Sequence, residues 1–318
     1  MKRCSSIMMV HPPEVVQPTR LRAAPLGRYR PKLRQRIEEY LLDKTHRLFE
    51  PLRTLGKDGN AESLHKMRVS SRRLRVGLRF FSDLFQSGEL KTVQRQLRRI
   101  TRCLGKLREL DVNVQLLRKL RSRLSAASRS SGVALEHSLL VERTRRLGEL
   151  DRLMKALDVG KFDLGMLALI GSRRRAFDAK RLLKESSRQL DELSRTVRKR
   201  HRQFMKRRTN AAFHNLRIAS KQYRYALEAS QAVFQMRLKP RVRALETLQD
   251  LMGAVHDVEV LIDAIKRRAR GNKTLAKSTR RMVEILQDDR NERFAAFEKF
   301  VSTKPVWTKK IKLTLPDE

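Results

Sequence analysis

SLHKMRVSSRRLRVGLRFF, residues 63–81, aligns with AFHNLRIASKQYRYALEAS, residues 212–230. His65 matches His214, an offset of 149 positions. A second pair of stretches, CLGKLRELDV (103–112) and LMGAVHDVEV (251–260), repeats at an offset of 148. Because two separate motifs repeat at almost the same offset, the sequence predicts the duplication of a four-helix unit.

The first copy predicts a helix with a basic ridge on one side and a core face on the other. At about 100° per residue, the basic side chains share an arc of about 80°, and the apolar side chains of the same stretch lie opposite. The ridge of the first copy consists of His65, Arg68, Arg72, Arg75 and Arg79. A nearly pure row of arginines suits bidentate contact with phosphate oxygens, so we expect it to bind a polyanion.

The second copy repeats the ridge, and the helix that follows the first copy extends it. The second ridge consists of His214, Arg217, Lys221 and Arg224, and Glu228 stands where the first copy has Arg79. The extension consists of Arg95, Arg99 and Arg102, which share one narrow arc. The corresponding helix of the second copy lacks such a row, so we expect the first half to carry more of the positive surface than the second half.

The charge of the chain also indicates a polyanionic ligand. Lys and Arg number 74 against 34 Asp and Glu, which gives a formal net charge of +40 over 318 residues. Such a surplus opposes folding through self-repulsion unless an anion offsets it. Nucleic acid, an anionic membrane and inorganic polyphosphate are the candidates. Aromatic residues make up 5% of the chain, which argues against stacking platforms for single-stranded nucleic acid.

Helical periodicity without strand-like alternation predicts an all-α fold of two four-helix bundle repeats. The breaks between periodic segments, including SRSSG (128–132) and DVGKFDLG (158–165), predict eight long helices near 36–54, 62–86, 90–125, 133–157, 176–208, 211–234, 240–269 and 273–302. Five prolines in residues 1–32 predict a flexible basic leader. The helical domain spans 33–302, with repeats over about 33–160 and 176–302, and a polar tail spans 303–318.

No apolar run is long enough to span a membrane. The two cysteines, Cys4 and Cys103, have neither metal-ligand nor disulfide-framework spacing, so we expect a cytoplasmic protein. Oligomeric state is not indicated by the sequence.

The paired motifs resemble the CHAD family, the conserved histidine α-helical domain, over about residues 33–302. This resemblance implies two four-helix bundles related by pseudo-twofold symmetry, with basic residues lining a central channel or groove. It also implies binding of inorganic polyphosphate through the ridge residues named above, and association with polyphosphate granules. The family pattern has Arg-Asp-x-Asp where this chain reads RELD, with Glu109 in place of an aspartate. We expect the acids of this motif to anchor Arg or His side chains.

Four other functions compete with polyphosphate binding as interpretations of the sequence. A metal site at His65 and His214 lacks a third ligand, and the neighbouring arginines would repel a cation. Catalysis is not expected, because neither a phosphate-binding G-x-x-x-x-G-K-[ST] loop nor an E-x-E-x-K signature occurs. No cofactor is expected. The alternative is nonspecific nucleic-acid binding through backbone electrostatics, and a scaffold that recruits proteins to granules is a third interpretation.

Overall fold

The structure of the chain is a computed structural model, and it describes residues 33–56, 59–172, 178–303, 311 and 313–314. The chain divides into two units, Met1–Pro31 and Lys32–Glu318, and every described residue belongs to the second. The predicted leader at 1–32 lies outside the described residues. Of the predicted tail, Ile311 and Leu313 are buried in the main core.

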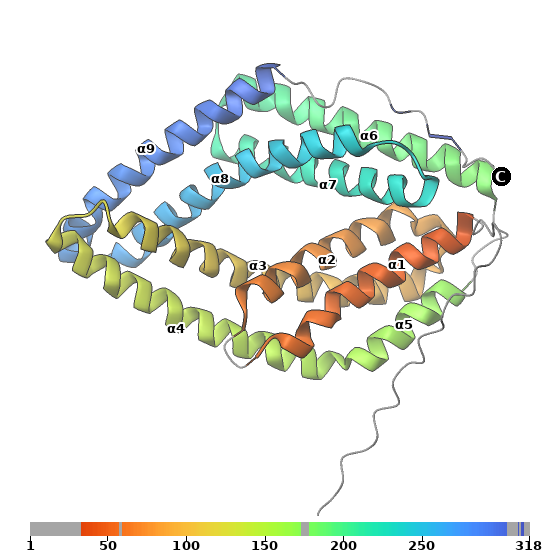
Figure 1. The fold of residues 1–318 in the computed structure, drawn as a ribbon, viewed down its shortest axis with the longest axis horizontal. Helices are drawn as coiled ribbons and strands as arrows, with labels where there is room; N and C mark the ends of the chain where they lie inside the picture. The colour runs from red at the N-terminus through yellow and green to blue at the C-terminus, as the bar shows by residue number, and fades with distance from the viewer. Residues whose placement is uncertain (1–32, 57–58, 173–177, 304–310, 312, 315–318) are drawn as a thin grey trace, which may run out of the picture. The chain divides into compact units, whose positions relative to one another are not determined.

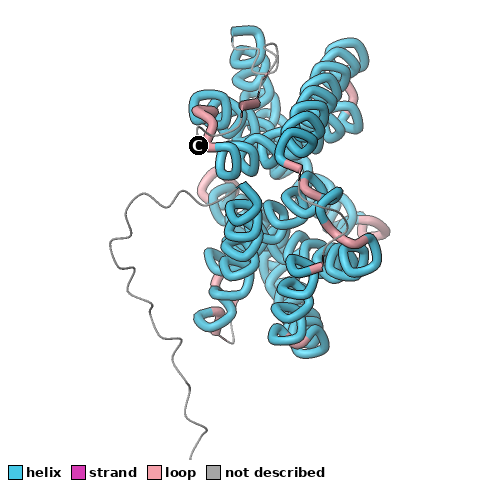
Figure 2. Tube along the Cα trace, turned by 90° about the vertical axis from the view of Figure 1, so that its right-hand side faces the viewer, coloured by secondary structure: helices cyan, strands magenta, loops and turns pink. Residues whose placement is uncertain are grey.

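The described residues are helical throughout, with loops between the helices and no strand (Figures 1 and 2). The all-α class is therefore confirmed. The α-helices and short 3-10 helices are α1 (Leu33–Phe49), η1 (Glu50–Thr54), α2 (Ala61–Phe80), η2 (Ser82–Leu84), α3 (Ser87–Arg121), α4 (Ala126–Leu157), α5 (Val159–Gly171), α6 (Ala179–Arg207), α7 (Asn210–Phe234), α8 (Lys239–Ala269) and α9 (Lys273–Thr303). None of the described helices is long and apolar enough to cross a membrane.

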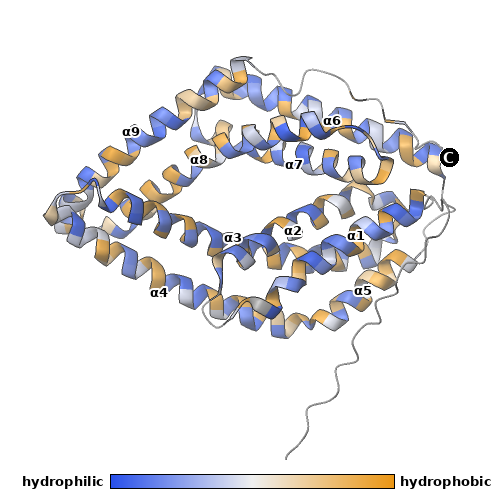
Figure 3. Ribbon diagram, viewed as in Figure 1, coloured by the Kyte–Doolittle hydropathy of each residue, from blue (hydrophilic) through white to orange (hydrophobic). Residues whose placement is uncertain are grey.

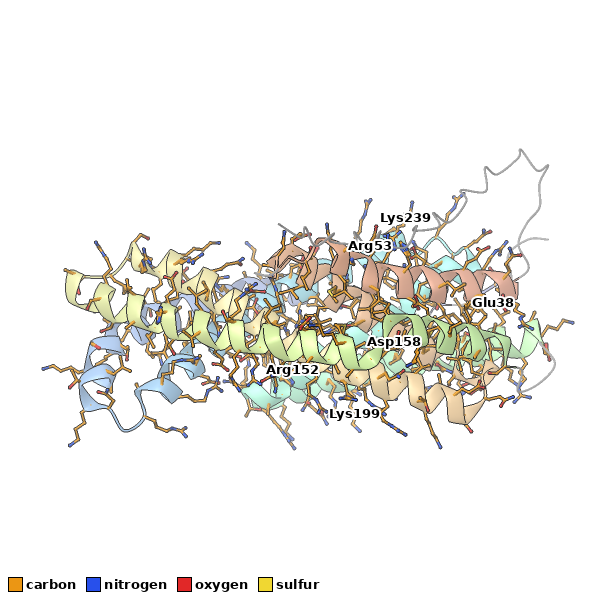
Figure 4. All side chains as sticks on the ribbon, turned by 90° about the horizontal axis from the view of Figure 1, so that it is seen from below. Glu38, Arg53, Arg152, Asp158, Lys199 and Lys239 are labelled. Carbon is orange, nitrogen blue, oxygen red and sulfur yellow. The ribbon has the colours of Figure 1, made fainter. Side chains whose placement is uncertain are left out.

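One predicted break was wrong, and a second was shorter than predicted. SRSSG lies inside α4, which begins after Ser125, because its serines continue the helix and its glycine is buried against Arg121 and Leu124. DVGKFDLG forms the junction to α5 and the first turns of that helix. The backbone turns at Asp158, which is labelled in Figure 4 and has a φ of +54°. The Asp158 carboxylate accepts a hydrogen bond from the Lys161 N–H. This N-terminal cap starts a new helix where the glycines suggested a loop.

The two ridge helices, α2 and α7, begin in the same way. Asn60 caps α2 by accepting a hydrogen bond from the Glu62 N–H at 2.8 Å. Thr209, at the matching position before α7, accepts one from the Ala212 N–H at 3.2 Å. Each cap satisfies a backbone donor that the first helical turn leaves without a partner. Both ridges therefore begin from a fixed helix end.

The apolar sides of the helices form a continuous core. Leu74 and Leu78 of α2 are fully buried on the side opposite the ridge, which confirms the predicted core face of this helix. Burial of such a side chain contributes about 1.5–3 kcal/mol. Each long helix carries both hydrophilic and hydrophobic positions along its length (Figure 3). A smaller cluster joins α3, α4, α8 and α9 at one end of these helices.

The same sequential packing recurs in the two halves of the domain. Helices α1 to α4 pack each on the next, and so do α6 to α9. Between the halves, α2 contacts α7 and α3 contacts α8. In Figure 1 the α2–α3 pair and the α7–α8 pair accordingly lie across from one another in the middle of the described domain. A twofold relation between the halves stays a prediction.

Two matching ion pairs hold the ridge helices in place. Arg143 of α4 donates to Asp111 of α3 at 2.6 Å, and it also donates to the carbonyl of Gly59 just before α2. Arg290 of α9 donates to Glu259 of α8 at 2.9 Å and to the side chain of Asn210 at 3.2 Å. Arg143 thus links α3 and α4 to the start of α2, and Arg290 links α8 and α9 to the start of α7.

Candidate polyanion-binding site

Both ridges line one cleft between the halves of the domain, with a volume of about 860 Å³. Helices α2, α3, α7 and α8 supply its walls, and Arg293 of α9 reaches it. Basic side chains outnumber acidic ones among the lining residues. The basic set is Arg68, Arg72, Arg73, Arg102, Lys106, Arg108, Arg217, Lys221, Arg224 and Arg293, and the acidic set is Glu109, Glu246, Asp250 and Asp257.

Two arginines from different halves of the chain line this cleft and form no salt bridge with the described residues. Arg217 is 8% exposed, and Arg68 is half-buried. Within the described residues neither forms a salt bridge, and the Nε atom of each has no hydrogen-bond partner. Burying a cation without a partner is costly. The cleft therefore carries an excess of positive charge, which suits an anionic ligand.

Crowding of these cations lowers the pKa of their neighbours. Burial, together with Arg217, Arg72 and Arg68, lowers the pKa of Lys221 to about 6. Burial, together with Arg217, His214, Lys221 and Arg68, lowers the pKa of His256 to about 3. Both effects have one physical cause, because a low-dielectric site already rich in positive charge disfavours another cation.

The two motif histidines share this environment. Burial, Arg108 and Arg68 lower the pKa of His65. Burial, Arg217 and Lys221 lower the pKa of His214, whose ring centroid lies 5.6 Å from that of His256. The histidines are therefore neutral at neutral pH while the cleft holds no anion, and a bound anion would favour their charged forms.

One side of the cleft is neutralised by the protein itself. Arg73 donates to Glu228 at 2.7 Å, and Arg224 lies 2.9 Å from Glu246 and 3.3 Å from Glu228. Two of the lining arginines are thus already paired with carboxylates. The uncompensated charge is concentrated on Arg68, Arg72, Arg217 and Lys221, and along α3.

The cleft brings together eight of the twelve residues predicted from the sequence. Those that line it are His65, Arg68, Arg72, Arg102, His214, Arg217, Lys221 and Arg224. The other four lie outside the cleft lining: Arg75 and Arg79 come after the lining residues of α2, and Arg95 and Arg99 come before those of α3. A helix rises 1.5 Å per residue, so a ridge that runs seven residues past the lining extends about 10 Å beyond it. A role for these four residues in binding stays a prediction.

Comparison with known families agrees with this geometry. The family model described as the CHAD domain matches residues 32–266. The chain belongs to the CHAD family. Its fold is similar to the crystal structure of the CHAD domain from the plant Ricinus communis, at 20% sequence identity and a TM-score of 0.58, covering 89% of this chain and 94% of the other.

A second solved structure has the same fold. PptA from Streptomyces chartreusis is 16% identical to this chain with a TM-score of 0.62, and the alignment covers 87% of this chain and 99% of PptA. A comparison with curated proteins found no match. CHAD domains are associated with polyphosphate binding, which makes the central cleft the candidate site of this one.

Several lining residues of the CHAD cleft were not predicted from the ridge pattern. Arg108 lies about 120–180° away from the members of the α3 row on a helical wheel, yet it lines the cleft and lowers the pKa of His65. Arg73 lies beside the α2 ridge, and Arg293 comes from a helix without any ridge. Arg108 could have been identified by its place within the repeated LGKLRELDV motif, whereas Arg293 had no sequence signal.

The acidic residues of the repeated motif have two different roles in this CHAD domain. Asp111 and Glu259 anchor arginines, as expected, but these arginines belong to α4 and α9 and not to the ridges. Glu109 and Asp257 occupy matching positions and both line the cleft. Burial raises the pKa of Asp257, and Arg217 opposes that shift. The described residues contain no cluster of three or more His, Cys, Asp or Glu arranged to hold a metal ion.

Proposed function

We propose that this protein binds inorganic polyphosphate in the cleft between the two ridges. The observation that carries the proposal is a pair of arginines without salt-bridge partners among the described residues, Arg68 and Arg217, which matching positions of the two repeats contribute to one cleft. A polyanion would supply the missing negative charge to both at once. Their planar guanidinium groups can each bind two oxygens of a phosphate.

The chemistry of the lining favours polyphosphate over nucleic acid. Polyphosphate has a dense line of charge and no bases, so it needs cations and no stacking partners. Tyr225 is the aromatic side chain among the described lining residues, and the Arg224 guanidinium already covers its ring at 4.8 Å from the centroid. Without a free Phe, Tyr or Trp ring among its described lining residues, the cleft offers few stacking partners to single-stranded bases.

Binding is proposed as the whole activity of the chain, without catalysis, and association with polyphosphate granules would follow from it. A fluorescent fusion should colocalise with stained granules in cells that make polyphosphate. Its distribution should become diffuse when polyphosphate synthesis is abolished. Persistence of the same foci without polyphosphate would contradict granule association through this ligand.

The decisive experiment compares the affinities of polyphosphate and duplex DNA over a salt series. The cleft variant is Arg68→Ala/Arg217→Ala. The matched control, Arg198→Ala/Arg202→Ala, removes the same charge from exposed positions of α6 that line no part of the cleft. We expect the wild type to prefer polyphosphate, the cleft variant to bind at least about tenfold more weakly, and the control to bind like the wild type.

Two results would contradict this proposal. Equal binding of both polymers, with the two double variants affected alike, would mean that the net charge of +40 acts diffusely. Preference for duplex DNA at moderate salt, lost in the cleft variant, would assign the cleft to the backbone of a nucleic acid. Circular dichroism and thermal unfolding should establish that each variant retains its fold.

A further inference from the structure

Two glycines at matching positions line the cleft from the middle of long helices. Gly105 lies within α3 and Gly253 within α8, and each follows a leucine or methionine in the second repeated motif. Neither has a positive φ, so the backbone would accept alanine at both positions. Glycine inside a helix is less stable than alanine, because it loses more conformational freedom on folding.

Packing within the protein does not explain these glycines either. Apart from its chain neighbours and the backbone of its own helix, a Cβ atom built at Gly105 or Gly253 meets no atom of the described residues within 4 Å. Gly77 of α2 shows the contrast, since a Cβ there would lie 2.7 Å from the ring of Tyr40. Gly77 is required by helix packing, whereas Gly105 and Gly253 face open space inside the cleft.

An independent observation indicates that a ligand occupies that space. Arg217 lines the same cleft, is 8% exposed, and has an Nε atom without a hydrogen-bond partner among the described residues. Arg102 and Lys106 lie directly beside Gly105 along the α3 lining. The open space over the glycines is therefore bordered by cations that could bind an anion.

We infer that Gly105 and Gly253 determine ligand specificity by letting a narrow polyanion chain approach the backbones of α3 and α8 closely. This inference rests on the proposed polyphosphate-binding function and deepens it. The N–H groups of both glycines lie inside α-helices and are engaged in helix hydrogen bonds. Each glycine thus contributes space, because it has no side chain. This space allows the phosphate oxygens to come within reach of the flanking cations. A chain without side groups, such as polyphosphate, can use this room, and a duplex cannot.

The test separates stability from binding through neutral substitutions that leave the charge of the cleft unchanged. Gly105→Ala and Gly253→Ala are made singly and together, with Gly105→Leu as a larger step. The matched control is Gly148→Ala in α4, a mid-helix glycine that also meets no atom within 4 Å but lines no part of the cleft. Thermal unfolding, polyphosphate affinity and duplex DNA affinity are measured for each, alongside Arg68→Ala/Arg217→Ala.

We expect opposite effects on stability and on binding. Every alanine variant, the control included, should raise the unfolding midpoint by about 1–4 °C per substitution. The Gly105→Ala/Gly253→Ala variant should bind polyphosphate about tenfold more weakly, and Gly105→Leu more weakly still. Duplex DNA affinity should stay unchanged in all of them, and so should polyphosphate affinity in the control.

The possible failures are distinguishable. Wild-type polyphosphate affinity in the glycine variants, with binding lost in Arg68→Ala/Arg217→Ala, would overturn the role of the glycines and leave the proposed function intact. Undiminished binding in the arginine variant would overturn both. An equal loss of affinity in Gly148→Ala would mean that helix stiffening and not cleft width weakens binding, which also contradicts the inference.

Discussion

The Nε atom of Arg73 lies 2.7 Å from a carboxylate oxygen of Glu228, so an ion pair joins the first ridge helix to the second beside the cleft. Glu228 also lies 3.3 Å from Arg224. It stands at the position where the first copy of the motif has Arg79. One acidic residue thus links the two halves and reduces the positive charge on one side of the cleft.

Removal of this carboxylate should strengthen ligand binding at the expense of stability. In Glu228→Gln, Arg73 and Arg224 lose part of their compensation and become available to phosphate. We expect polyphosphate affinity to rise about threefold to tenfold, and the free energy of unfolding to fall by about 1–2 kcal/mol. The control is Glu284→Gln in α9, which removes the same charge from a position that does not line the cleft. Weaker binding by Glu228→Gln would mean that the ion pair with Arg73 positions the ridge helices for binding, and that it does not keep the arginines away from the ligand.

Lys221 should also show a conflict between stability and function. Its side chain is half-buried close to Arg217, Arg72 and Arg68, so an apolar side chain of similar length should suit the free protein better. We expect Lys221→Met to raise the free energy of unfolding by about 1–3 kcal/mol without ligand, and to weaken polyphosphate binding. Denaturant unfolding and a binding titration measure the two effects. Lys199→Met, on the exposed side of α6, is the control, and a loss of stability in Lys221→Met would contradict the uncompensated charge.

Polyphosphate affinity should rise as the pH falls. Lys221 has a pKa of about 6 in the free protein against an ordinary value of 10.5, and the pKa values of His65 and His214 are lowered as well. A bound polyanion favours the charged forms, so binding takes up protons, and affinity falls between about pH 6 and pH 9 as the pH rises. Titrations at constant ionic strength measure this slope. Lys221→Met should flatten the upper part of the profile, and a pH-independent affinity would contradict proton uptake.

The stability of the free protein should change in the opposite direction over the same range. A group whose pKa is lowered by folding binds more protons in the unfolded state, so the free energy of unfolding rises with pH. For Lys221 this rise begins near pH 6 and ends near its ordinary pKa of 10.5. Denaturant unfolding at several pH values, without polyphosphate, measures it. A free protein that loses stability from about pH 6 to about pH 9 would contradict the buried, crowded state of the cleft cations.

The ion pairs at the starts of the ridge helices should differ in their contribution to stability. The side chains of Arg143 and Asp111 are 16% and 4% exposed, against 28% and 13% for Arg290 and Glu259. Loss of a partner from a buried pair leaves the other charge uncompensated, so we expect Arg143→Ala to cost about 3 kcal/mol and Arg290→Ala about 1–2 kcal/mol. Denaturant unfolding measures both. Arg145→Ala, which removes an exposed ion pair of α4, should change stability by less than about 1 kcal/mol.

The sequence by itself determined the helical class, and its repeated motifs predicted a duplicated unit with two basic ridges. Apolar residues at helical spacing predict which face of α2 is buried, and the structure places Leu74 and Leu78 there. The cap residues Asn60 and Thr209 occupy matching positions because the repeat preserves local chemistry. Where local signals conflicted the prediction failed, as at Asp158, whose side chain starts α5 within a glycine-containing stretch.

Only the tertiary structure decided which charges of a ridge are free. Arg75 and Arg224 occupy matching positions, yet Arg224 lines the cleft and is paired with Glu246, whereas Arg75 lies beyond the lining beside Arg98. Periodicity fixes the side of a helix on which a residue lies. It does not fix the neighbouring helix that the residue meets or the level along the axis at which they meet. Burial and pairing depend on those long-range contacts, so the cleft and its uncompensated arginines emerge only when the two halves pack together.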